Sequence, residues 1–337
     1  MAGIGYSRTL PRGINPAPGD EQMPTDFSQT LVIGISATAL FDLREADRIF
    51  QEHQSSDPTT AIRLYRDYML QRENEPLAPG TGMPLVVALL DLNRHTPAGE
   101  PALVEVVVMS RNSPETGIRV LNHIRRLNLG ISRHAFTGGE SVVDYLDAFD
   151  VDLFLTTNVE DAQRVIDSGQ CPAAIVKPPP QEPRDLPQGE VRIAFDGDAV
   201  LFDDASELVF KAEGLDAFHR TENDQQDIPM GEGPYATLLR KLALLQDRLP
   251  ETVELSPVRI AIVTARGAPA EMRVIKTLRH WGVYVDELFF LGGMEKAKIL
   301  KAFRPHIFFD DQDLHLQDIS TAYPAGKVPY KSSSRLS

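Results

Sequence analysis

Seven short apolar runs recur along the chain, and they constrain the fold more than any other feature of the sequence. Segments with helical patterns lie between successive runs. Unbroken apolar strands separated by helices predict a parallel sheet that is covered on both faces. This is the doubly wound α/β class, in which ligands bind at the carboxyl ends of the strands. The runs are LVIGISA (31–37), LVEVVVMS (103–110), VDLFLTT (151–157), VRIAFDG (191–197), VRIAIVTA (258–265), DELFFLGG (286–293) and HIFFDDQ (306–312).

A proline-rich segment divides these runs into two groups. Lys177–Glu190 holds five prolines in fourteen positions, which excludes regular helix and central strand alike. We therefore place a domain boundary there, and the length of 337 residues agrees with two packed units. The predicted division is a disordered N-terminal segment (1–28), a first domain (29–177), a linker (178–190), a second domain (191–330) and a flexible tail (331–337).

Composition and charge exclude several classes of partner. The 48 acidic and 34 basic residues give a net charge of −14, which argues against nucleic acid but not against a small phosphorylated molecule. No apolar run approaches the roughly 18 residues of a membrane helix, so no membrane partner is expected. The N-terminus shows no apolar secretory core and Cys171 is the single cysteine, so a cytoplasmic location is the default expectation. The number of subunits stays open, with a homo-oligomer among the options.

Polar residues follow the apolar runs of the second half, at the points where strands are expected to end. Because the carboxyl ends of neighbouring parallel strands converge, these residues can meet in space. A metal-assisted phosphoryl transfer needs a carboxylate nucleophile, a second acid or base, carboxylates for Mg²⁺, a hydroxyl donor and a cation. The set is Asp196, Asp198, Thr264, Lys296, Asp310 and Asp311.

Each of these residues has a simpler explanation when it is taken alone. Asp-Gly is common turn chemistry, Thr264 could cap a helix, and Lys296 could be a solvated residue in a first helical turn. Asp310 and Asp311 could be a helix N-cap and its neighbour. We favour a shared site because four strand ends carry suitable groups together. Lys298 is the reserve candidate for the cation, ranked lower because it lies farther into the helix.

The order and spacing of four motifs resemble the haloacid dehalogenase-like superfamily of phosphotransferases. The motifs are FDGDAVLF, IVTARG, the lysine after LGGM, and FFDDQ. Within that superfamily the chain is most similar to the cytosolic 5′-nucleotidases of the AMP-preferring type I class. The phrases AFDGDAVLF, TLRHWG, RPHIFFDDQ and ENEPLAPG carry this closer likeness, which covers roughly residues 29 to 330.

The resemblance implies how the covalent chemistry and the metal are arranged. Asp196 would attack phosphorus and form an aspartyl-phosphate. Asp198 would protonate the departing 5′-oxygen and later deprotonate the attacking water. Mg²⁺ would be held by Asp196, the backbone carbonyl of Asp198, and one or both of Asp310 and Asp311, with waters completing its octahedron.

The same resemblance implies which groups hold the phosphate and the rest of the substrate. Thr264 would donate a hydrogen bond to a phosphate oxygen, and Lys296 would offset the clustered negative charge. Gly197 would keep the turn between the two aspartates open. Ala265 and Arg266, which follow Thr264, are further candidates for substrate contact.

The insertion at about residues 205–235 is too long for a tight crossover, and it predicts a small helical cap over the site. Within it, Phe210, Phe218, His219 and Arg220 could stack on a base or reach a ribose. Phe210 and Phe218 lie at a helical spacing that is also typical of core residues. Packing is therefore the alternative role for these two aromatic side chains.

From Ser110 to Thr157 the first half of the chain repeats the second half at one constant offset without a gap. Upstream of this window, Ser36 and Thr38 align with Asp196 and Asp198 after one gap. This repeat predicts two tandem doubly wound units of the haloacid dehalogenase type, of which the first is degenerate. The first unit lacks the carboxylates needed to hold Mg²⁺ or to form an aspartyl-phosphate. The correspondences are Ser36 with Asp196, Thr38 with Asp198, Ser110 with Thr264, Gly138-Gly139 with Gly292-Gly293, Val142 with Lys296, and Thr156-Thr157 with Asp310-Asp311.

Two roles stay open for the degenerate half. It could be a scaffold, or its hydroxyls together with Arg111 and Asn112 could bind an anion without a metal. The type I nucleotidases that the chain resembles respond to adenine nucleotides. ADP or ATP is therefore the first ligand to try as an effector.

These observations lead to one main functional hypothesis and to alternatives of other classes. The main hypothesis is a Mg²⁺-dependent 5′-nucleotidase that converts a nucleoside 5′-monophosphate, AMP-like or IMP/GMP-like, into a nucleoside and phosphate. One alternative is a phosphatase for another small phosphomonoester, such as a sugar phosphate. Another is a non-catalytic nucleotide-binding or phospho-accepting regulatory protein. Asp198 favours turnover, because an acid/base two residues after the nucleophile does not suit a long-lived phosphoryl group.

Overall fold

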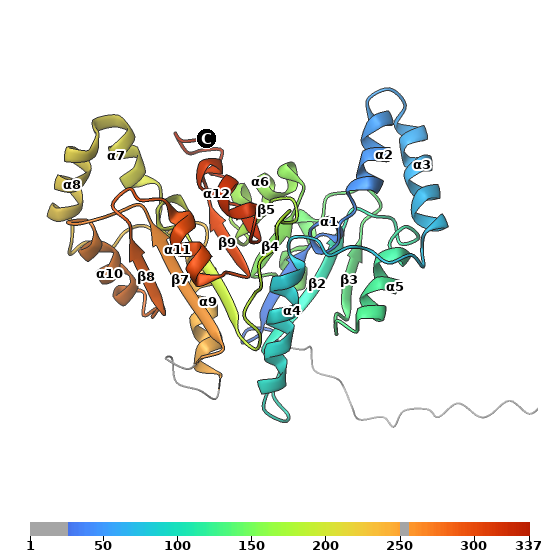
Figure 1. Ribbon diagram of the computed structural model, residues 1–337, viewed down its shortest axis with the longest axis horizontal. Coiled ribbons are helices and arrows are strands. Elements are labelled where there is room, and N and C mark those ends of the chain that lie inside the picture. The colour runs from blue at the N-terminus through green and yellow to red at the C-terminus, as the bar shows by residue number, and fades with distance from the viewer. Residues whose placement is uncertain (1–25, 250–255) are drawn as a thin grey trace, which may run out of the picture.

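The computed structural model describes residues 26–249 and 256–337, and all strands within these ranges lie in a single sheet. The sheet has ten strands in the order β3-β2-β1-β4-β5-β10-β9-β6-β7-β8 (Figure 1). The strands are β1 (Leu31–Ile35), β2 (Val104–Ser110), β3 (Arg133–Phe136), β4 (Leu153–Thr156), β5 (Ala173–Val176), β6 (Val191–Phe195), β7 (Val258–Thr264), β8 (Glu287–Phe290), β9 (Ile307–Asp310) and β10 (Ala325–Lys327). Every apolar run identified in the sequence contains one of these strands, which confirms the predicted mixed α/β class with a mostly parallel sheet.

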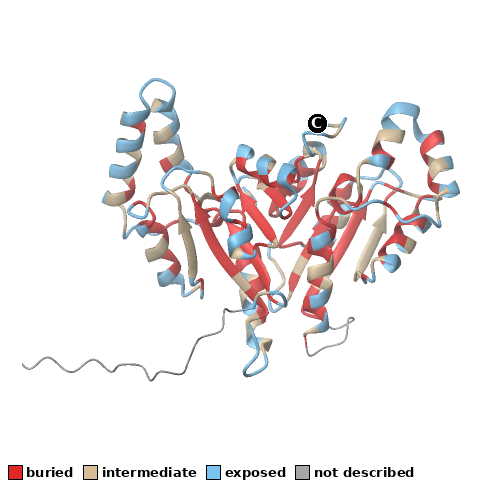
Figure 2. Cartoon of the chain, turned by 180° about the vertical axis from the view of Figure 1, so that it is seen from behind, coloured by how far each residue is buried: buried red, intermediate tan, exposed pale blue. Residues whose placement is uncertain are grey.

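From one edge to the middle the strand order is β3-β2-β1-β4-β5, and from the other edge it is β8-β7-β6-β9-β10. Each half of the chain thus arranges its five strands in the same order. The two series meet where β10 pairs antiparallel with β5, with Gly326 opposite Val176, while the other strand pairs are parallel. The edge strands β3 and β8 are half-buried, and the strands between them are largely buried (Figure 2). Strands β3, β5 and β10 were not identified from the sequence. β3 is polar and β10 has only three residues, whereas β5 is as long as β4 and β9.

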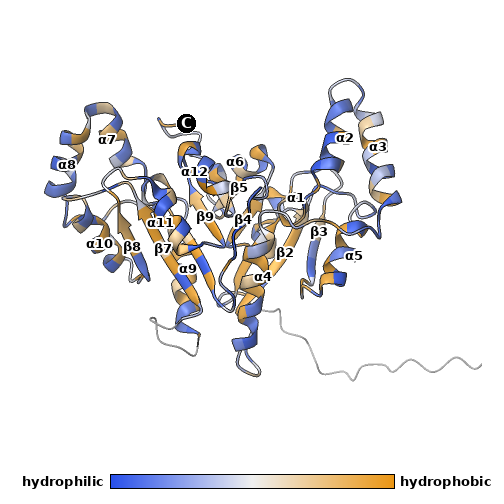
Figure 3. Ribbon diagram, viewed as in Figure 1, coloured by the Kyte–Doolittle hydropathy of each residue, from blue (hydrophilic) through white to orange (hydrophobic). Residues whose placement is uncertain are grey.

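Helices cover both faces of the sheet, and apolar residues concentrate on the strands (Figure 3). Within the described residues, no helix combines the length and the apolar character needed to cross a membrane. The α-helices are α1 (Ala37–Leu40), α2 (Arg44–Gln54), α3 (Pro58–Gln71), α4 (Met83–Asp91), α5 (Ile118–Leu127), α6 (Val159–Ser168), α7 (Ala205–Glu213), α8 (Leu215–Asp224), α9 (Ala236–Asp247), α10 (Glu271–His280), α11 (Lys296–Phe303) and α12 (Asp313–Ser320). Shorter helical turns are η1 (Leu92–His95), η2 (Val143–Tyr145), η3 (Asp147–Phe149) and η4 (Gly197–Leu201).

The two faces of the sheet pack differently. On one face, side chains from β1, β2, β6, β7 and β9 form a single core with α4 and α9, so this core spans both halves of the chain. The opposite face carries two separate cores, one in each half. Alternate residues of one strand divide between the faces, as Ile193 and Ala194 of β6 do, because successive side chains of a strand point to opposite sides.

Two helical hairpins, α2/α3 and α7/α8, project from the same side of the molecule (Figure 1). The hairpin α7/α8 lies in the insertion where the sequence predicts a cap, whereas its counterpart α2/α3 was not expected. The backbone closes both hairpins in the same way: the N–H of Gly80 donates to Leu40 and that of Gly233 donates to Leu201, both at 2.9 Å. A Cβ atom at Gly233 would lie 2.3 Å from the carbonyl oxygen of Phe202, so only glycine fits there.

His306, which precedes β9, allows a prediction about stability. Its side chain is buried and Nδ1 accepts a hydrogen bond from the backbone N–H of Arg192 at 3.0 Å. Burial lowers the pKa of His306 to about 4, whereas an unfolded histidine titrates near 6.5. The unfolded chain therefore binds the proton more tightly, and stability is lost as the pH falls from about 6.5 toward 4.

We expect His306→Gln to reduce this loss, because the titrating group is removed. At pH 5 the histidine is expected to lower the free energy of unfolding by about 2 kcal/mol relative to pH 8. Urea unfolding at both pH values measures the difference. His280→Gln is the matched control, since His280 is exposed. Equal pH dependence in wild type and His306→Gln would contradict the assignment.

Candidate active site

The polar residues predicted from the sequence gather at the carboxyl ends of β6, β7 and β9. Asp196 directly follows β6, Thr264 ends β7 and Asp310 ends β9. These side chains are neighbours because β6 lies between β7 and β9 in the sheet. Lys296 joins them from the first residue of α11. The structure thus brings together groups from four segments that are distant in the sequence.

Lys296 bridges two carboxylates at the centre of this group. Its Nζ lies 2.8 Å from Oδ1 of Asp196 and 2.7 Å from Oδ2 of Asp310, and all three side chains are buried. Burial opposes the charge on Lys296, but the two carboxylates together raise its pKa. Lys296 is therefore a fixed cation in the site. Lys298, the reserve candidate, is exposed and pairs with Glu295 instead.

The pKa values of the two aspartates that contact Lys296 are shifted in opposite directions. Burial raises the pKa of Asp196 to about 6, against the opposing charge of Lys296. Burial also disfavours the charge on Asp310, yet Lys296 and His315 hold the pKa of Asp310 below its ordinary value. Asp310 is thus the more firmly ionised carboxylate.

Asp311 has an incomplete set of partners. The hydroxyl of Tyr330 donates to Oδ2 of Asp311, while Oδ1 is buried with no hydrogen-bond partner among the described residues. Burial, together with the charges of Asp196 and Asp310, raises the pKa of Asp311 to about 8. A buried acceptor without a partner is costly. A cation at this place would satisfy Oδ1 and reduce the repulsion.

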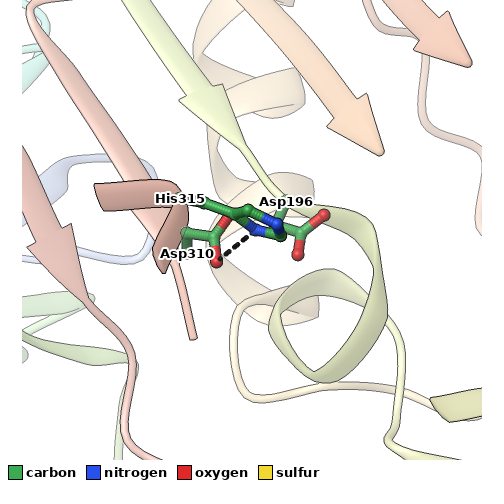
Figure 4. A group of neighbouring side chains, drawn as sticks. All are labelled: Asp196, Asp310 and His315. Atoms are coloured by element: carbon green, nitrogen blue, oxygen red, sulfur yellow. Dashed lines mark hydrogen bonds and ion pairs between the residues drawn. The ribbon is translucent and has the colours of Figure 1, made fainter. Parts of the chain in front are cut away.

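The donor atoms present fit a divalent metal ion. Asp196, Asp310 and His315 each offer one ligand atom, and these atoms lie within 4.8 Å of one another (Figure 4). The unpaired oxygen of Asp311 adds another carboxylate. Such oxygen ligands are those that Mg²⁺ prefers. His315, on α12, was not identified from the sequence, although the segment DDQDLH places it five residues after Asp310.

Gly197 and Thr264 lie against each other beside Asp196. The N–H of Gly197 donates to Oδ1 of Asp196 at 2.6 Å. A Cβ atom added to Gly197 would lie 3.4 Å from Oγ1 of Thr264. Thr264 is buried, and Oγ1 accepts a hydrogen bond from the N–H of Arg266 at 3.2 Å. The hydroxyl therefore sits next to the turn that carries the aspartates.

Asp198 is held by an arginine. Arg266 donates from Nε to Oδ2 of Asp198 at 2.8 Å and from Nη2 to Oδ1 at 2.5 Å. Its third nitrogen, Nη1, donates to Oε2 of Glu222 at 2.5 Å. Arg266, a candidate for substrate contact, thus makes its hydrogen bonds with two carboxylates of the protein. Ala265, its neighbour, accepts a backbone hydrogen bond from Gly293 at 3.0 Å.

Glu222 connects the hairpin α7/α8 to the site through its contact with Arg266. It lies on α8 and is fully buried, and it also accepts hydrogen bonds from Arg273 at 2.9 Å and from Ser206 at 2.7 Å. The charges of the two arginines offset those of Glu222 and Asp198, as burial requires. This role could not be predicted from the sequence, because the surrounding TENDQQD segment has the composition of an exposed surface.

The four hairpin residues proposed from the sequence differ in their surroundings. Phe218 is buried, and its ring lies 5.2 Å from the guanidinium carbon of Arg266. It also packs edge-on against Phe210, which is itself exposed. His219 is half-buried and Arg220 is exposed. Of these four residues, Phe218 contacts the network that holds Asp198, and that contact is cation–π packing.

The equivalent position in the first half has the same backbone geometry. Gly139 donates to the carbonyl of Arg111, as Gly293 donates to that of Ala265. Ser36 donates its N–H to Leu155 at 2.8 Å, as Asp196 donates to Phe309 at 2.8 Å. Both pairs of hydrogen bonds follow the correspondence found in the sequence, so the repeated residues occupy like positions in the sheet.

The side chains at this first-half position are bonded to one another. Arg111 donates to both oxygens of the buried Asp161, at 3.0 and 2.6 Å, and Ser141 donates to the same carboxylate at 2.9 Å. Asn112 accepts a hydrogen bond from Tyr65 at 2.6 Å. The guanidinium of Arg111 is thus neutralised by a carboxylate. In residues 26–249 and 256–337, the group of Asp196 is the one cluster with metal-ligand spacing.

Comparisons with known proteins show to which family the chain belongs. The model of the 5′-nucleotidase family matches residues 23–335. The chain is 34% identical to human "Cytosolic 5'-nucleotidase 1B" over 302 residues, which are 87% of this chain and 48% of that protein. The chain thus spans about half the length of this relative. No solved structure matches the chain.

Proposed function

Because the chain belongs to the 5′-nucleotidase family, we propose that it hydrolyses nucleoside 5′-monophosphates to nucleosides and inorganic phosphate. The observation that carries this proposal is the buried contact of Lys296 with Asp196 and Asp310, which supports Asp196 as a carboxylate nucleophile beside a cation. The name of the human relative supports both this activity and a cytosolic location. Because this chain spans only about half of that relative, the same activity and location are proposed for this chain.

The proposed cofactor is Mg²⁺. Asp196, Asp310, Asp311 and the backbone carbonyl of Asp198 would hold it. The close spacing of Asp196 and Asp310 supports this set, and so does the unpaired Oδ1 of Asp311. When bound, the ion would supply positive charge to the phosphate oxygens. His315 bonds to Asp310 and would orient that carboxylate.

In the first chemical step, an oxygen of Asp196 forms a bond to phosphorus and the bond from phosphorus to the 5′-oxygen breaks. Asp198 transfers its proton to the departing oxygen, so the nucleoside leaves as an alcohol. Arg266 already donates two hydrogen bonds to Asp198 in the structure, and the carboxylate formed in this step would keep them. This ion pair would stabilise Asp198 in the state that the second step needs.

In the second step, a water molecule attacks the phosphorus of the aspartyl-phosphate and gives a proton to Asp198. The bond between phosphorus and the oxygen of Asp196 breaks, which regenerates the carboxylate and releases phosphate. Lys296 would offset the charge on Asp196 throughout, and Thr264 would donate to a phosphate oxygen. Substrate contacts of Gly197, Ala265, Phe218, His219 and Arg220 stay predictions, as does that of Arg266.

The strand order and the matching backbone hydrogen bonds of the two halves support a duplication. We propose that each half is a doubly wound unit of the haloacid dehalogenase type, that the first has lost its catalytic carboxylates, and that α7/α8 is the cap of the second. The boundaries 29–177 and 191–330 are proposed on the same basis. Binding of ADP or ATP by the first half stays a prediction, and the pairing of Arg111 with Asp161 gives it no added support.

A phosphate-release screen tests the proposed function. AMP, IMP, GMP and several sugar phosphates are each incubated with the protein, with and without Mg²⁺. Release from nucleoside monophosphates that requires Mg²⁺ is the expected result. Release from sugar phosphates alone would favour the alternative phosphatase. Nucleotide binding without any release would favour the non-catalytic alternative.

A further inference from the structure

A segment after β10 connects the active site to the first half of the chain. It begins at Tyr330, whose hydroxyl donates to Oδ2 of Asp311 and lies 3.4 Å from Oε1 of Glu207 on α7. Glu207 is also paired with Lys211 at 2.8 Å. Lys211 therefore balances the charge of Glu207. Asp311, in contrast, depends on Tyr330 for its hydrogen-bond donor.

Residues Tyr330–Ser334, here called the strap, are held at several points. Gln163 of α6 donates to the backbone carbonyl of Tyr330 at 2.8 Å. Ser332 donates from both its N–H and its hydroxyl to Asp167 of α6, each at 2.7 Å. Ser334 donates to Asp204, the residue before α7. Although the sequence predicts a flexible tail from residue 331, the strap thus joins α6 of the first half to the base of the hairpin α7/α8.

We propose that Tyr330 is a positioning residue that holds Asp311 for metal binding, and that α6 supports it through the strap. This inference rests on the proposed metal-dependent function. Asp311 lies close to two other carboxylates that repel it, so an unrestrained side chain would turn away from them. The bond from Tyr330 fixes Oδ2 and leaves the buried Oδ1 available as a ligand.

The proposal also gives the degenerate half a function. Its helix α6 carries both Gln163 and Asp167, and these residues bind the strap. Removal of a hydrogen-bond partner of a metal ligand typically lowers metal affinity or activity by about 10- to 100-fold. Loss of the Tyr330 hydroxyl is therefore expected to weaken Mg²⁺ binding by about tenfold or more.

The test compares Tyr330→Phe with wild type by calorimetric titration with Mg²⁺ alone, in the absence of nucleotide. We expect the dissociation constant to rise by about tenfold, and the Mg²⁺ concentration for half-maximal activity to rise with it. Tyr323→Phe is the matched control, because Tyr323 is buried and its hydroxyl contacts Lys301 instead. An affinity for Mg²⁺ within twofold of wild type, or a tighter one, in folded Tyr330→Phe would overturn the proposal.

A second variant tests the support from the first half. Asp167→Ala together with Gln163→Ala removes the anchors on α6 and leaves Tyr330 and the catalytic residues in place. We expect weaker Mg²⁺ binding, with kcat recovered at saturating Mg²⁺. Asp144→Ala, a change at an exposed first-half carboxylate, is the control. Unchanged Mg²⁺ affinity in the double variant would overturn the role of α6.

The calorimetric readout separates this inference from the proposed function. A wild-type protein that binds Mg²⁺ but releases phosphate from no nucleotide would contradict the function, while the effect of Tyr330→Phe on Mg²⁺ binding would still support the inference. A wild-type protein that hydrolyses nucleotides but loses no Mg²⁺ affinity in Tyr330→Phe would contradict only the inference.

Discussion

Asp196→Asn is expected to abolish phosphate release while the protein stays folded. The amide has nearly the same shape as the carboxylate but is a far weaker nucleophile, so the covalent step fails. The expected loss in kcat is at least about 10²-fold. The fold should persist because Lys296 keeps its contact with Asp310 at 2.7 Å, and because one of three crowded negative charges is removed. Single-turnover phosphate release and thermal unfolding measure the two effects.

Asp203→Asn is the matched control for this variant. Asp203 lies in the same segment, and its Oδ1 accepts a hydrogen bond from the N–H of Ala205, which asparagine can also accept. We expect this control to keep nearly full activity. A loss of less than about tenfold in Asp196→Asn would be incompatible with covalent catalysis by this residue.

Removal of divalent metal is expected to eliminate phosphate release as completely as Asp196→Asn does. Asp196, Asp310 and Asp311 outnumber the single ammonium of Lys296, so without a cation the site would repel a phosphate dianion. Burial, together with the neighbouring negative charges, raises the pKa of Asp311 to about 8. Phosphate release after exhaustive EDTA treatment, followed by addition of Mg²⁺, measures the dependence. Restored activity is expected with Mg²⁺, because the donors are hard oxygen atoms.

The pH dependence of Mg²⁺ binding provides an independent check. Below its pKa, Asp311 holds a proton that the metal must displace, so the affinity for Mg²⁺ should fall as the pH decreases from about 8 to about 6. Asp311→Asn should weaken Mg²⁺ binding and flatten this dependence. Full activity in the presence of excess EDTA would refute the metal requirement.

The sequence alone located seven of the ten strands and predicted which chemistry their ends carry. Apolar runs identify buried parallel strands, and the carboxyl ends of such strands meet at one edge of the sheet. This is why Asp196, Lys296 and Asp310 could be placed together before any contact between them was known. Their contact agrees with that prediction, and their catalytic roles stay proposals. The repeat was also visible, because corresponding residues keep a constant spacing along the chain.

Only the tertiary structure decided how the charges of the site are partnered. Nothing local distinguishes Glu222 from an exposed glutamate of a polar segment, yet its helix buries it against Arg266 and Arg273. Tyr330 likewise follows a short strand without any motif, and its contact with Asp311 depends on how β10 joins the two halves. Such pairings are set by the packing of elements far apart in the chain. Hydrophobic periodicity reports which face of an element is buried, but not which polar group another element brings to it.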